Sequence, residues 1–579
     1  MDLLKTNLAA ENTSTTPKAV FFYPRHEITL QQLALFLIWV VCGAVWLIRR
    51  CRGKRDTQTT PTLKDGLIKA KQAEDEGEEG QPADHKTAVE DTLTKLENGT
   101  EICGETNKSN SVKVDMVVVS STQPNNGQFP NGGKLKSNDK TFTSVKPPCS
   151  FDDFLKYVMV FGAIMMYFYL CDYRKVFPAT ERVYVRDTFL FLVFLLFLVA
   201  SAFTVTPTAD KLINRDQTEE WKGWMQVMFV WYHYFAAKEW YNWIRVYIAA
   251  YVWMTGFGNF SFFWVRKDFS LWRMLKMLFR LNFLVIVMCA VTDNEYMNYY
   301  ICAMHTYWFL TVYIFMRTFN SWNQNRFLML IKFAAYALAN AIIFDVPGVC
   351  EKVFYPAWII LKFHNGNYPL MHEWAFRGGL DHWATFVGML CAYNYPHYEN
   401  LMNWLDEKAS YKGERLTSLG IKLCMAGVAV VIGIIWYEEV MTKDKHEYNA
   451  LHPYTSWTPI LIFIVLRNLF PVARTHYLNL FAFLGKITLE TYLSQLHVYL
   501  QSNAKELIGY IPGYPLLNLA FSTVIYLIIS YVLFHLTVEF SCYLLPRDMQ
   551  RFGRNVMLIA VILTISMIGA FTIKTIFHI

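Results

Sequence analysis

The chain is patterned as long apolar segments joined by short polar stretches, and this pattern runs from about residue 151 to the end. The segments are roughly 16 to 25 residues long, and most can cross a hydrocarbon core of ~30 Å as one α-helix. The pattern predicts an all-α polytopic membrane protein, a bundle of about 10–14 transmembrane helices. Two stretches, 221–237 and 353–363, are candidates for re-entrant or interfacial helices. The predicted segments, with one near the N-terminus, are 28–48, 153–171, 187–206, 221–237, 243–264, 277–292, 298–317, 327–346, 374–393, 416–437, 456–471, 476–500, 515–538 and 555–577.

Polar flanks organise the N-terminal quarter of the chain. Residues 1–27 are polar, 28–48 form the first predicted transmembrane helix, and five basic residues follow directly: Arg49, Arg50, Arg52, Lys54 and Arg55. Positive charge marks the cytoplasmic end of a membrane helix, so we expect segment 1–27 to be luminal. Residues 49–150 show no lasting apolar period and are predicted to be a disordered cytoplasmic linker, followed by a multi-pass membrane domain at 151–579.

Two further observations bear on this topology. Asn98 and Asn107 begin glycosylation-type triplets within the linker, and they should carry no glycan if the linker is cytoplasmic. The same count of spans makes the loop 172–186 luminal, although it carries four basic residues, which argues against the count: Arg174, Lys175, Arg182 and Arg186.

Composition narrows the class of protein. Only 17% of the residues are charged and 54% are hydrophobic, whereas about 25% are charged in an average soluble protein. This balance excludes a soluble enzyme, a nucleic-acid-binding module and a disulfide scaffold. The net charge of +7 indicates cytoplasmic-loop anchoring rather than attraction for a polyanion. The 11 cysteines include no CxxC pair, and the acidic and histidine pairs at 372–373 and 381–382 lack a third ligand, so we predict no metal site.

A polar stripe runs along one otherwise aromatic segment, 221–237. Lys222 and His233 are eleven residues apart, so at ~100° per residue they lie within about 20° of one helical face. Gln226 lies about 40° from Lys222 on that face. Eleven residues span ~16 Å, so a Lys222 at the interface would place His233 near mid-membrane. Ionisable groups within a bilayer mark functional sites, so this stripe is the first candidate for chemistry.

Two interpretations of the stripe remain open. In one, His233 is a packing histidine bonded to a neighbouring helix, and Lys222 extends to lipid head groups. In the other, His233 takes a proton from an attacking hydroxyl or carries an acetyl group, while Lys222, with Gln226 beside it, binds cytosolic acetyl-CoA. Arg245 and Arg280 lie near predicted membrane entry points, where they either bind CoA phosphates or anchor the helices as positive-inside residues.

Several stretches carry a resemblance to a known family. The segments 216–235, 244–264 and 278–285, the pair Leu380-Asp381 and the run 485–490 resemble the membrane domain of the sialic acid O-acetyltransferases. Fungal capsule O-acetylation proteins and plant reduced-wall-acetylation proteins share this domain, in a family described as ten-transmembrane acyltransferases of the Golgi. More distantly, Lys222-Gly223 and Tyr232-His233 are similar, at the same spacing, to the Arg-Gly and Tyr-His pairs of bacterial O-antigen-type acyltransferases.

Two motifs of these relatives differ here. The animal sialate enzymes carry a luminal esterase-like domain with a Gly-Asp-Ser nucleophile and an Asp-x-x-His pair, and this chain contains neither motif. The bacterial relatives carry a late motif that ends in histidine, and Gln495 stands at that position. His497 follows two residues later and would point about 200° away on a helix, so we do not expect it to replace that histidine.

The resemblance implies an enzyme, a membrane-bound O-acetyltransferase that takes acetyl from cytosolic acetyl-CoA and passes it to glycan or sialic acid hydroxyls. It implies a Golgi membrane location with a luminal N-terminus, a carbohydrate acceptor, and a luminal esterase-like subunit that supplies the missing motifs. It implies neither a metal nor a nucleic acid. The alternative is an acetyl-CoA or acetyl-group transporter, or a donor subunit that serves a separate luminal acetyltransferase; a scaffold that only recruits such a subunit is a third interpretation.

Overall fold

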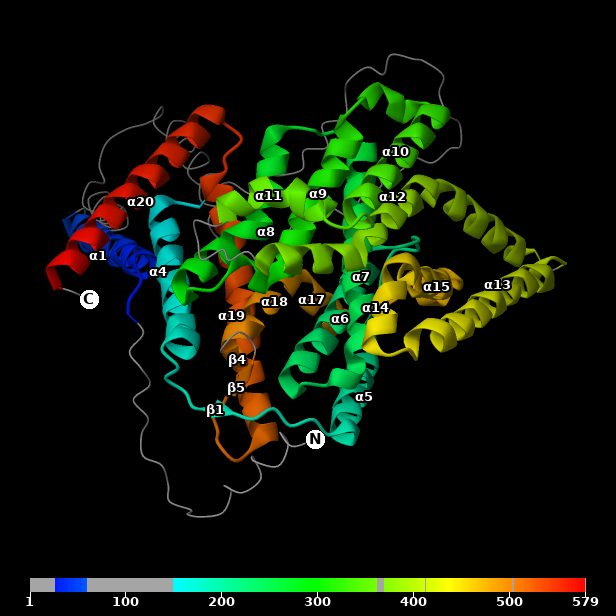
Figure 1. The fold of residues 1–579 in the computed structure, drawn as a ribbon, viewed down its shortest axis with the longest axis horizontal. Coiled ribbons are helices and arrows are strands. Elements are labelled where there is room, and N and C mark those ends of the chain that lie inside the picture. Colours follow the sequence, from blue (N-terminus) through cyan, green and yellow to red (C-terminus); the bar gives the residue numbers. More distant parts are fainter. Residues whose placement is uncertain (1–26, 60–148, 362–368, 412, 502–504, 578–579) are drawn as a thin grey trace, which may run out of the picture.

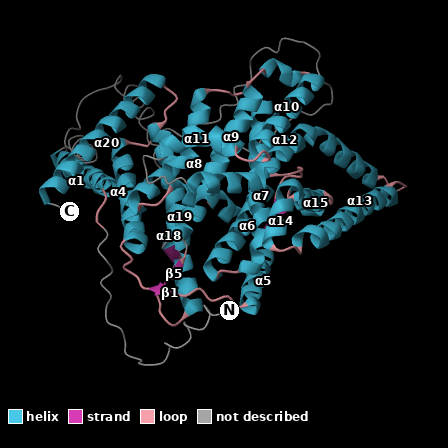
Figure 2. Ribbon diagram, in the orientation of Figure 1, coloured by secondary structure: helices cyan, strands magenta, loops and turns pink. Residues whose placement is uncertain are grey.

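The computed structural model describes residues 27–59, 149–361, 369–411, 413–501 and 505–577 of the 579-residue chain. Helices make up nearly all of this part, and its strands are only two or three residues long (Figures 1 and 2). The main helices are α1 (Leu30–Thr59), α4 (Phe151–Phe168), α5 (Arg186–Phe203), α6 (Arg215–Phe235), α7 (Tyr241–Arg266), α8 (Leu271–Thr292), α9 (Tyr300–Arg317), α10 (Arg326–Phe344), α11 (Val349–Leu361), α12 (Pro369–Ser410), α13 (Arg415–Trp436), α14 (Lys445–Thr455), α15 (Trp457–Asn468), α16 (Pro471–Arg474), α17 (Asn479–Lys486), α18 (Thr488–Val498), α19 (Pro515–Leu544) and α20 (Met549–Phe577).

Two small antiparallel sheets join segments that are distant in sequence. The first has the order β1 (Ala179–Thr180), β5 (Glu506–Ile508) and β4 (Leu500–Gln501), with Ala179 opposite Ile508. The second pairs β2 (Val205–Pro207) with β3 (His476–Leu478), with Val205 opposite Leu478. Each sheet therefore ties an early loop of the membrane domain to a late one.

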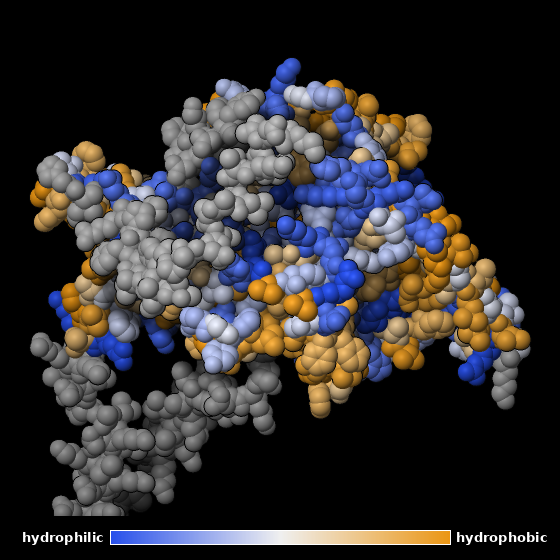
Figure 3. Space-filling view, turned by 60° about the horizontal axis from the view of Figure 1, so that its bottom comes forward, coloured by the Kyte–Doolittle hydropathy of each residue, from blue (hydrophilic) through white to orange (hydrophobic). Residues whose placement is uncertain are grey.

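Eight helices of the described part are long and apolar enough to cross a membrane: α1, α4, α5, α8, α10, α13, α19 and α20. They present large apolar side chains outward, such as Phe191 and Phe194 of α5, which are 62% and 64% exposed. Hydrophobic side chains gather at the right and lower edges of the face in Figure 3, as a lipid-facing surface requires. The long helices α6, α7, α9 and α12 bring the total within the predicted range, and the all-α polytopic fold is confirmed.

Some predicted boundaries are wrong. The first helix does not end at residue 48 but continues through the basic cluster to Thr59, so residues 49–59 do not belong to a disordered linker. Residues 60–148 of that linker lie outside the described residues. The apolar segment 476–500 is not one helix: it divides into β3, α17 and α18, with a break at Ile487. Segment 456–471 shrinks to α15, whose 12 residues are too few to cross a membrane.

Two reciprocal glycine contacts bring α6 and α17 together. A Cβ at Gly223 would lie 1.8 Å from the Phe481 carbonyl oxygen, and a Cβ at Gly485 would lie 1.8 Å from the Glu219 carbonyl oxygen. Only glycine lets the two backbones approach this closely, as small residues do between membrane helices. The stretch from Glu219 to Gly223 on α6 therefore packs directly against the stretch from Phe481 to Gly485 on α17.

The same arrangement joins α7 to α12. A Cβ at Gly256 would lie 2.3 Å from the Thr385 carbonyl oxygen, and a Cβ at Gly388 would lie 2.3 Å from the Trp253 carbonyl oxygen. These two crossings fix the polar interior helices against each other, and so they fix the side chains that those helices carry.

The two ends of the bundle are marked by polar contacts. At one end Arg49 of α1 pairs with Asp152 of α4, with 2.5 Å between Nε and Oδ1. At the other end of α4 the Tyr173 hydroxyl donates to the Glu27 carbonyl oxygen at 2.6 Å. We call the end that holds Arg49 the basic end. The β1–β5–β4 sheet lies at the opposite end, at the foot of α4 in Figure 1.

An exposed ion pair joins two loops at this opposite end. Arg186, the first residue of α5, lies 2.5 Å from Glu239, which follows α6. The hydrogen bond from Arg186 lowers the pKa of the Glu239 carboxyl. The carboxyl end of α6 therefore lies beside the start of α5, on the side of the bundle away from the basic end.

Candidate active site

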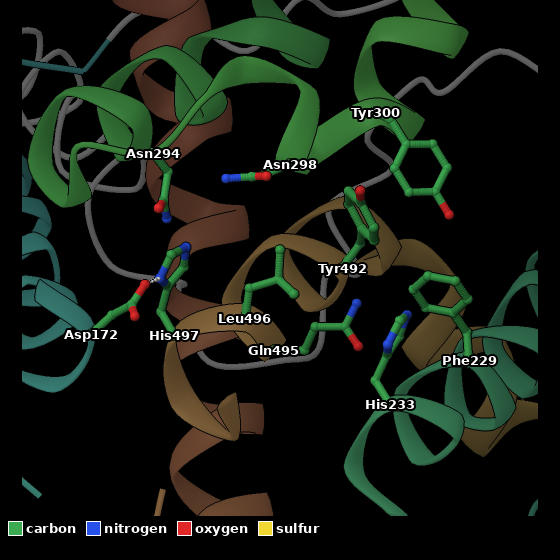
Figure 4. Close-up of a pocket in the computed structure, with 10 residues that line it drawn as sticks. All are labelled: Asp172, Phe229, His233, Asn294, Asn298, Tyr300, Tyr492, Gln495, Leu496 and His497. Carbon is green, nitrogen blue, oxygen red and sulfur yellow. Dashed lines mark hydrogen bonds and ion pairs between the residues drawn. The ribbon is translucent and has the colours of Figure 1, made fainter. Parts of the chain in front are cut away.

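A cavity of about 110 Å³ lies among α4, α6, α9 and α18 (Figure 4). Its walls combine two histidines, one carboxylate, three amides and two tyrosines with two apolar side chains. A concave site where a few polar side chains converge beside apolar ones is a candidate for binding or catalysis. The lining residues are Asp172, Phe229, His233, Asn294, Asn298, Tyr300, Tyr492, Gln495, Leu496 and His497.

His233 reaches the cavity from the last turn of α6. The helix begins where the Asn214 side chain accepts a hydrogen bond from the Asp216 N–H, and it ends where Ala236 adopts the left-handed conformation with φ of 54°. Lys222 therefore lies two turns inside the helix rather than at its start. His233 stands near the opposite terminus of the helix. Its position near mid-membrane stays a prediction.

The imidazole of His233 is held by packing alone. Its ring contacts Phe229 edge to face, with 4.8 Å between ring centroids, and Arg182 donates to its backbone carbonyl oxygen at 3.4 Å. Within the part of the chain that the structure describes, neither ring nitrogen has a hydrogen-bond partner. Both nitrogens therefore remain available to a molecule that enters the cavity. The stripe prediction that singled out His233 led to a residue of the cavity wall.

His497 is the second histidine of the cavity, and its nitrogens are both occupied. Nδ1 lies 2.9 Å from Oδ2 of Asp172, and Nε2 lies 2.7 Å from the Tyr299 hydroxyl. A carboxylate on one nitrogen fixes the orientation of an imidazole, as in hydrolase triads. His497 was not expected at the site, because helical geometry places it ~200° from Gln495. It lines the cavity all the same, because three consecutive residues of the last turn of α18 form part of the wall: Gln495, Leu496 and His497.

Gln495 occupies the wall beside His233. The residue is only 1% exposed, and neither Nε2 nor Oε1 of its amide has a hydrogen-bond partner among the described residues. Figure 4 shows this amide directed toward the imidazole of His233. Buried polar atoms are paired in the great majority of cases, so an amide with both atoms unpaired is an unusual feature of a wall.

Two arginines contact residues that line the cavity. The Arg377 guanidinium stands 4.5 Å above the ring of Tyr300, which lines the cavity, and it also pairs with Glu373 at 3.1 Å. Arg182 contacts the backbone of His233, as described above. No group of three or more metal-ligating side chains occurs among the described residues.

The predicted donor-binding residues Lys222 and Gln226 do not line the cavity. Lys222 Nζ lies 2.6 Å from Oε2 of Glu219, and the lysine side chain is 12% exposed. Gln226 is 5% exposed, and its Nε2 has no partner in the described part of the chain. On α6 they precede His233 by eleven and seven residues. Their role toward a donor stays a prediction.

Arg245 lies within a buried polar network on α7, α12 and α14. Its Nη2 is 2.7 Å from Oδ2 of Asp381, and the other carboxylate oxygen lies 3.2 Å from Nε2 of His452. Tyr448 completes the chain at 2.8 Å from Nδ1 of His452. The guanidinium is 1% exposed and paired with a buried carboxylate, and its role in donor binding or anchoring stays a prediction.

Arg280 lies elsewhere, between α8, α18 and α19. Its guanidinium forms a two-pronged ion pair with Glu490, with Nη2 and Oε2 3.0 Å apart, and Thr537 accepts a further hydrogen bond from Nη1 at 2.8 Å. Glu490 is completely buried. The structure thus gives Arg280 and Arg245 carboxylate partners in separate places, and it does not bring the four predicted donor-binding residues together.

A polytopic helical bundle whose polar cavity holds an unpaired imidazole has the features of a membrane-embedded enzyme. The chain matches, over residues 99–557, a family described as the 10 TM acyl transferase domain found in Cas1p. The chain therefore belongs to this acyltransferase family, as its sequence predicted. The match begins within the predicted linker 49–150 and includes every residue of the cavity wall.

One curated relative extends the comparison. The chain is 35% identical over 399 residues to the N-acetylneuraminate (7)9-O-acetyltransferase of Danio rerio. The alignment covers 66% of this chain and 50% of the relative, so the chain spans about half the length of the curated relative it matches. No solved structure matches the chain.

Proposed function

We propose that the chain transfers an acetyl group from acetyl-CoA to a sugar hydroxyl, with sialic acid as the acceptor. The observation that carries this proposal is the free imidazole of His233 in a polar cavity of an acyltransferase domain. The name of the Danio rerio relative supports the choice of acceptor. We assign His233 as the catalytic residue.

Acetyl transfer from a thioester to a hydroxyl needs one proton acceptor next to the reacting groups. The sugar hydroxyl gives its proton to the imidazole of His233 as its oxygen forms a bond to the thioester carbonyl carbon. The tetrahedral intermediate then breaks its C–S bond, and the CoA thiolate takes the proton back from the imidazolium. In a second route the imidazole first accepts the acetyl group and then passes it to the hydroxyl, which also needs an unpaired nitrogen.

The donor side is assigned to the basic end of the bundle. Positive charge after α1 favours a cytosolic location for that end, and Asp172 and the cavity lie toward the other end of α4. The face of α6 from Lys222 to His233 spans ~16 Å between the two. Lys222 and Gln226, with Arg245 and Arg280, remain the proposed donor contacts. The three cations among them already pair with carboxylates, so each would bind a CoA phosphate in addition to, or in place of, its carboxylate partner.

We also propose a location and a partner for this reaction. A donor in the cytosol and a sugar acceptor in the lumen suit a Golgi membrane, with the N-terminus luminal. A luminal esterase-like partner would supply the Gly-Asp-Ser and Asp-x-x-His motifs that the sequence lacks. Where such a partner takes part, it replaces direct attack by the sugar: the acetyl group carried by the imidazole in the second route passes to the partner, and the partner transfers it to the sugar.

A compartment-resolved assay tests the proposal. Purified full-length chain in liposomes is supplied with radiolabelled acetyl-CoA outside and sialic acid inside, with and without a luminal esterase-like subunit. Labelled O-acetyl sialic acid in the lumen is the expected product. Intact labelled acetyl-CoA in the lumen would instead identify a transporter, and no transfer with or without the subunit would contradict the proposal.

A further inference from the structure

The amide of Gln495 is an unexplained polar group in the cavity wall. Of the ten lining residues, it alone has fully buried side-chain polar atoms without a hydrogen-bond partner in the described part of the chain. An amide buried in this way destabilises the folded protein, because water no longer satisfies its donor hydrogens. A ligand that supplies the missing acceptor would remove this penalty.

The residues around Gln495 indicate which ligand atom would accept its hydrogen bond. Its amide is directed toward His233, whose nitrogens are free, whereas His497 on the same turn already bonds Asp172 and Tyr299 (Figure 4). A reacting carbonyl attacked at His233 must place its oxygen against a hydrogen-bond donor. The unpaired Nε2 of Gln495 is the buried donor on that wall.

We propose that Gln495 is a catalytic residue that stabilises the oxyanion of the acetyl transfer, an inference that rests on the proposed function. As the new bond to the carbonyl carbon forms, the C=O electron pair moves onto oxygen, and Nε2–H of Gln495 donates a hydrogen bond to that oxygen. The pair returns when the C–S bond breaks. Gln495 neither gains nor loses a proton.

This role explains why a neutral amide serves in this position. The donor needs no change of protonation state, so it works alongside a histidine that takes up and releases a proton at each turnover. A preorganised, buried donor also needs no rearrangement when charge develops, which makes such donors effective. The buried amide of Gln495, unpaired among the described residues, is the structural sign of that preorganisation.

Three substitutions of similar volume test the assignment in full-length protein. We expect Gln495→Leu and Gln495→Glu to lower kcat for acetyl transfer by about 10²- to 10³-fold, since neither side chain donates at neutral pH. The KM for acetyl-CoA should stay within about twofold of the parental value, because the bond forms mainly in the transition state. The matched control is Gln501→Leu: Gln501 is also a 1% exposed glutamine with an unpaired Oε1, but it lies on β4 and does not line the cavity.

Thermal stability separates a catalytic from a structural role. Removal of an unpaired buried amide should leave the melting temperature of Gln495→Leu unchanged or higher, while its kcat falls. A parental kcat, or an unfolded or clearly less stable Gln495→Leu protein, would overturn the inference. Failure of the proposed function looks different: the parental chain and His233→Ala would then give the same null rate, with the luminal subunit present, and the inference would fall with it.

Discussion

Nδ1 of His497 lies 2.9 Å from Oδ2 of Asp172, although 325 residues separate them in the chain. Asp172 follows α4, the first helix of the membrane domain, and His497 belongs to the last turn of α18. The cavity therefore closes only when the early and late parts of the domain pack together. Its shape depends on this contact even though His497 itself offers no free nitrogen.

Asp172→Ala should destabilise the protein, because Nδ1 of His497 loses its acceptor inside the bundle. We expect a loss of about 1–3 kcal/mol in the free energy of unfolding, and a smaller loss for Asp172→Asn, whose Oδ1 can still accept. Thermal unfolding in detergent measures both. Equal stability of Asp172→Ala and the parental protein would show that this contact does not hold the cavity wall.

Gly223→Ala and Gly485→Ala should each prevent correct assembly of α6 with α17. The new methyl would lie 1.8 Å from a backbone carbonyl oxygen in either case, and a backbone cannot move aside as a side chain does. We expect a loss of at least about 3 kcal/mol, seen as little monodisperse protein in size-exclusion chromatography.

A matched glycine provides the control. Gly427 lies within α13, and a Cβ there would meet nothing within 4 Å. Gly427→Ala should therefore be neutral or stabilising by up to about 1 kcal/mol. Normal assembly of Gly223→Ala would refute the close backbone contact between α6 and α17.

Arg280 can be assigned to structure or to donor binding by one set of variants. If its role is the ion pair with Glu490, Arg280→Met should cost about 3–5 kcal/mol of stability, because it leaves a buried carboxylate unpaired. Arg280→Met combined with Glu490→Met should then regain much of that loss. A raised KM for acetyl-CoA with normal stability in Arg280→Met would instead favour the donor-binding prediction.

The topology prediction can be tested on the linker. Asn98 and Asn107 should remain without glycans in a eukaryotic cell, because the basic residues after Ile48 predict a cytosolic linker. Mass spectrometry of the two peptides, before and after glycosidase treatment, gives the answer. A glycan at either asparagine would reverse the assignment of the donor and acceptor sides.

The sequence predicted most of the fold because apolar length is enough to define a spanning helix. α10 begins and ends within two residues of the predicted segment 327–346. α5 begins one residue before the predicted segment 187–206 and ends three residues before its end. The prediction of one helix over 476–500 was wrong because hydropathy does not show where a helix breaks. The break at Ile487 and the contact of Gly485 with Glu219 arise only in the packed domain.

The site was predicted in part. His233 could be found because an ionisable group on a helical face is visible in one short segment. Asp172 and His497 could not be paired, since nothing local in sequence joins two residues at opposite ends of the domain. That His497 does not replace the motif histidine stays a prediction: its side chain lines the cavity, but it is directed toward Asp172, whereas Gln495 is directed toward His233 (Figure 4).

The rate of acetyl transfer by His233→Ala tests the central claim most directly. The variant, checked for parental expression, monodispersity and melting temperature, is assayed in liposomes with radiolabelled acetyl-CoA, sialic acid and the luminal subunit. Loss of the general base should lower the rate by about 10²- to 10⁴-fold while acetyl-CoA binding stays nearly unchanged. A well-folded His233→Ala protein that transfers acetyl at the parental rate would show that His233 only packs against Phe229, and that the chemistry lies elsewhere.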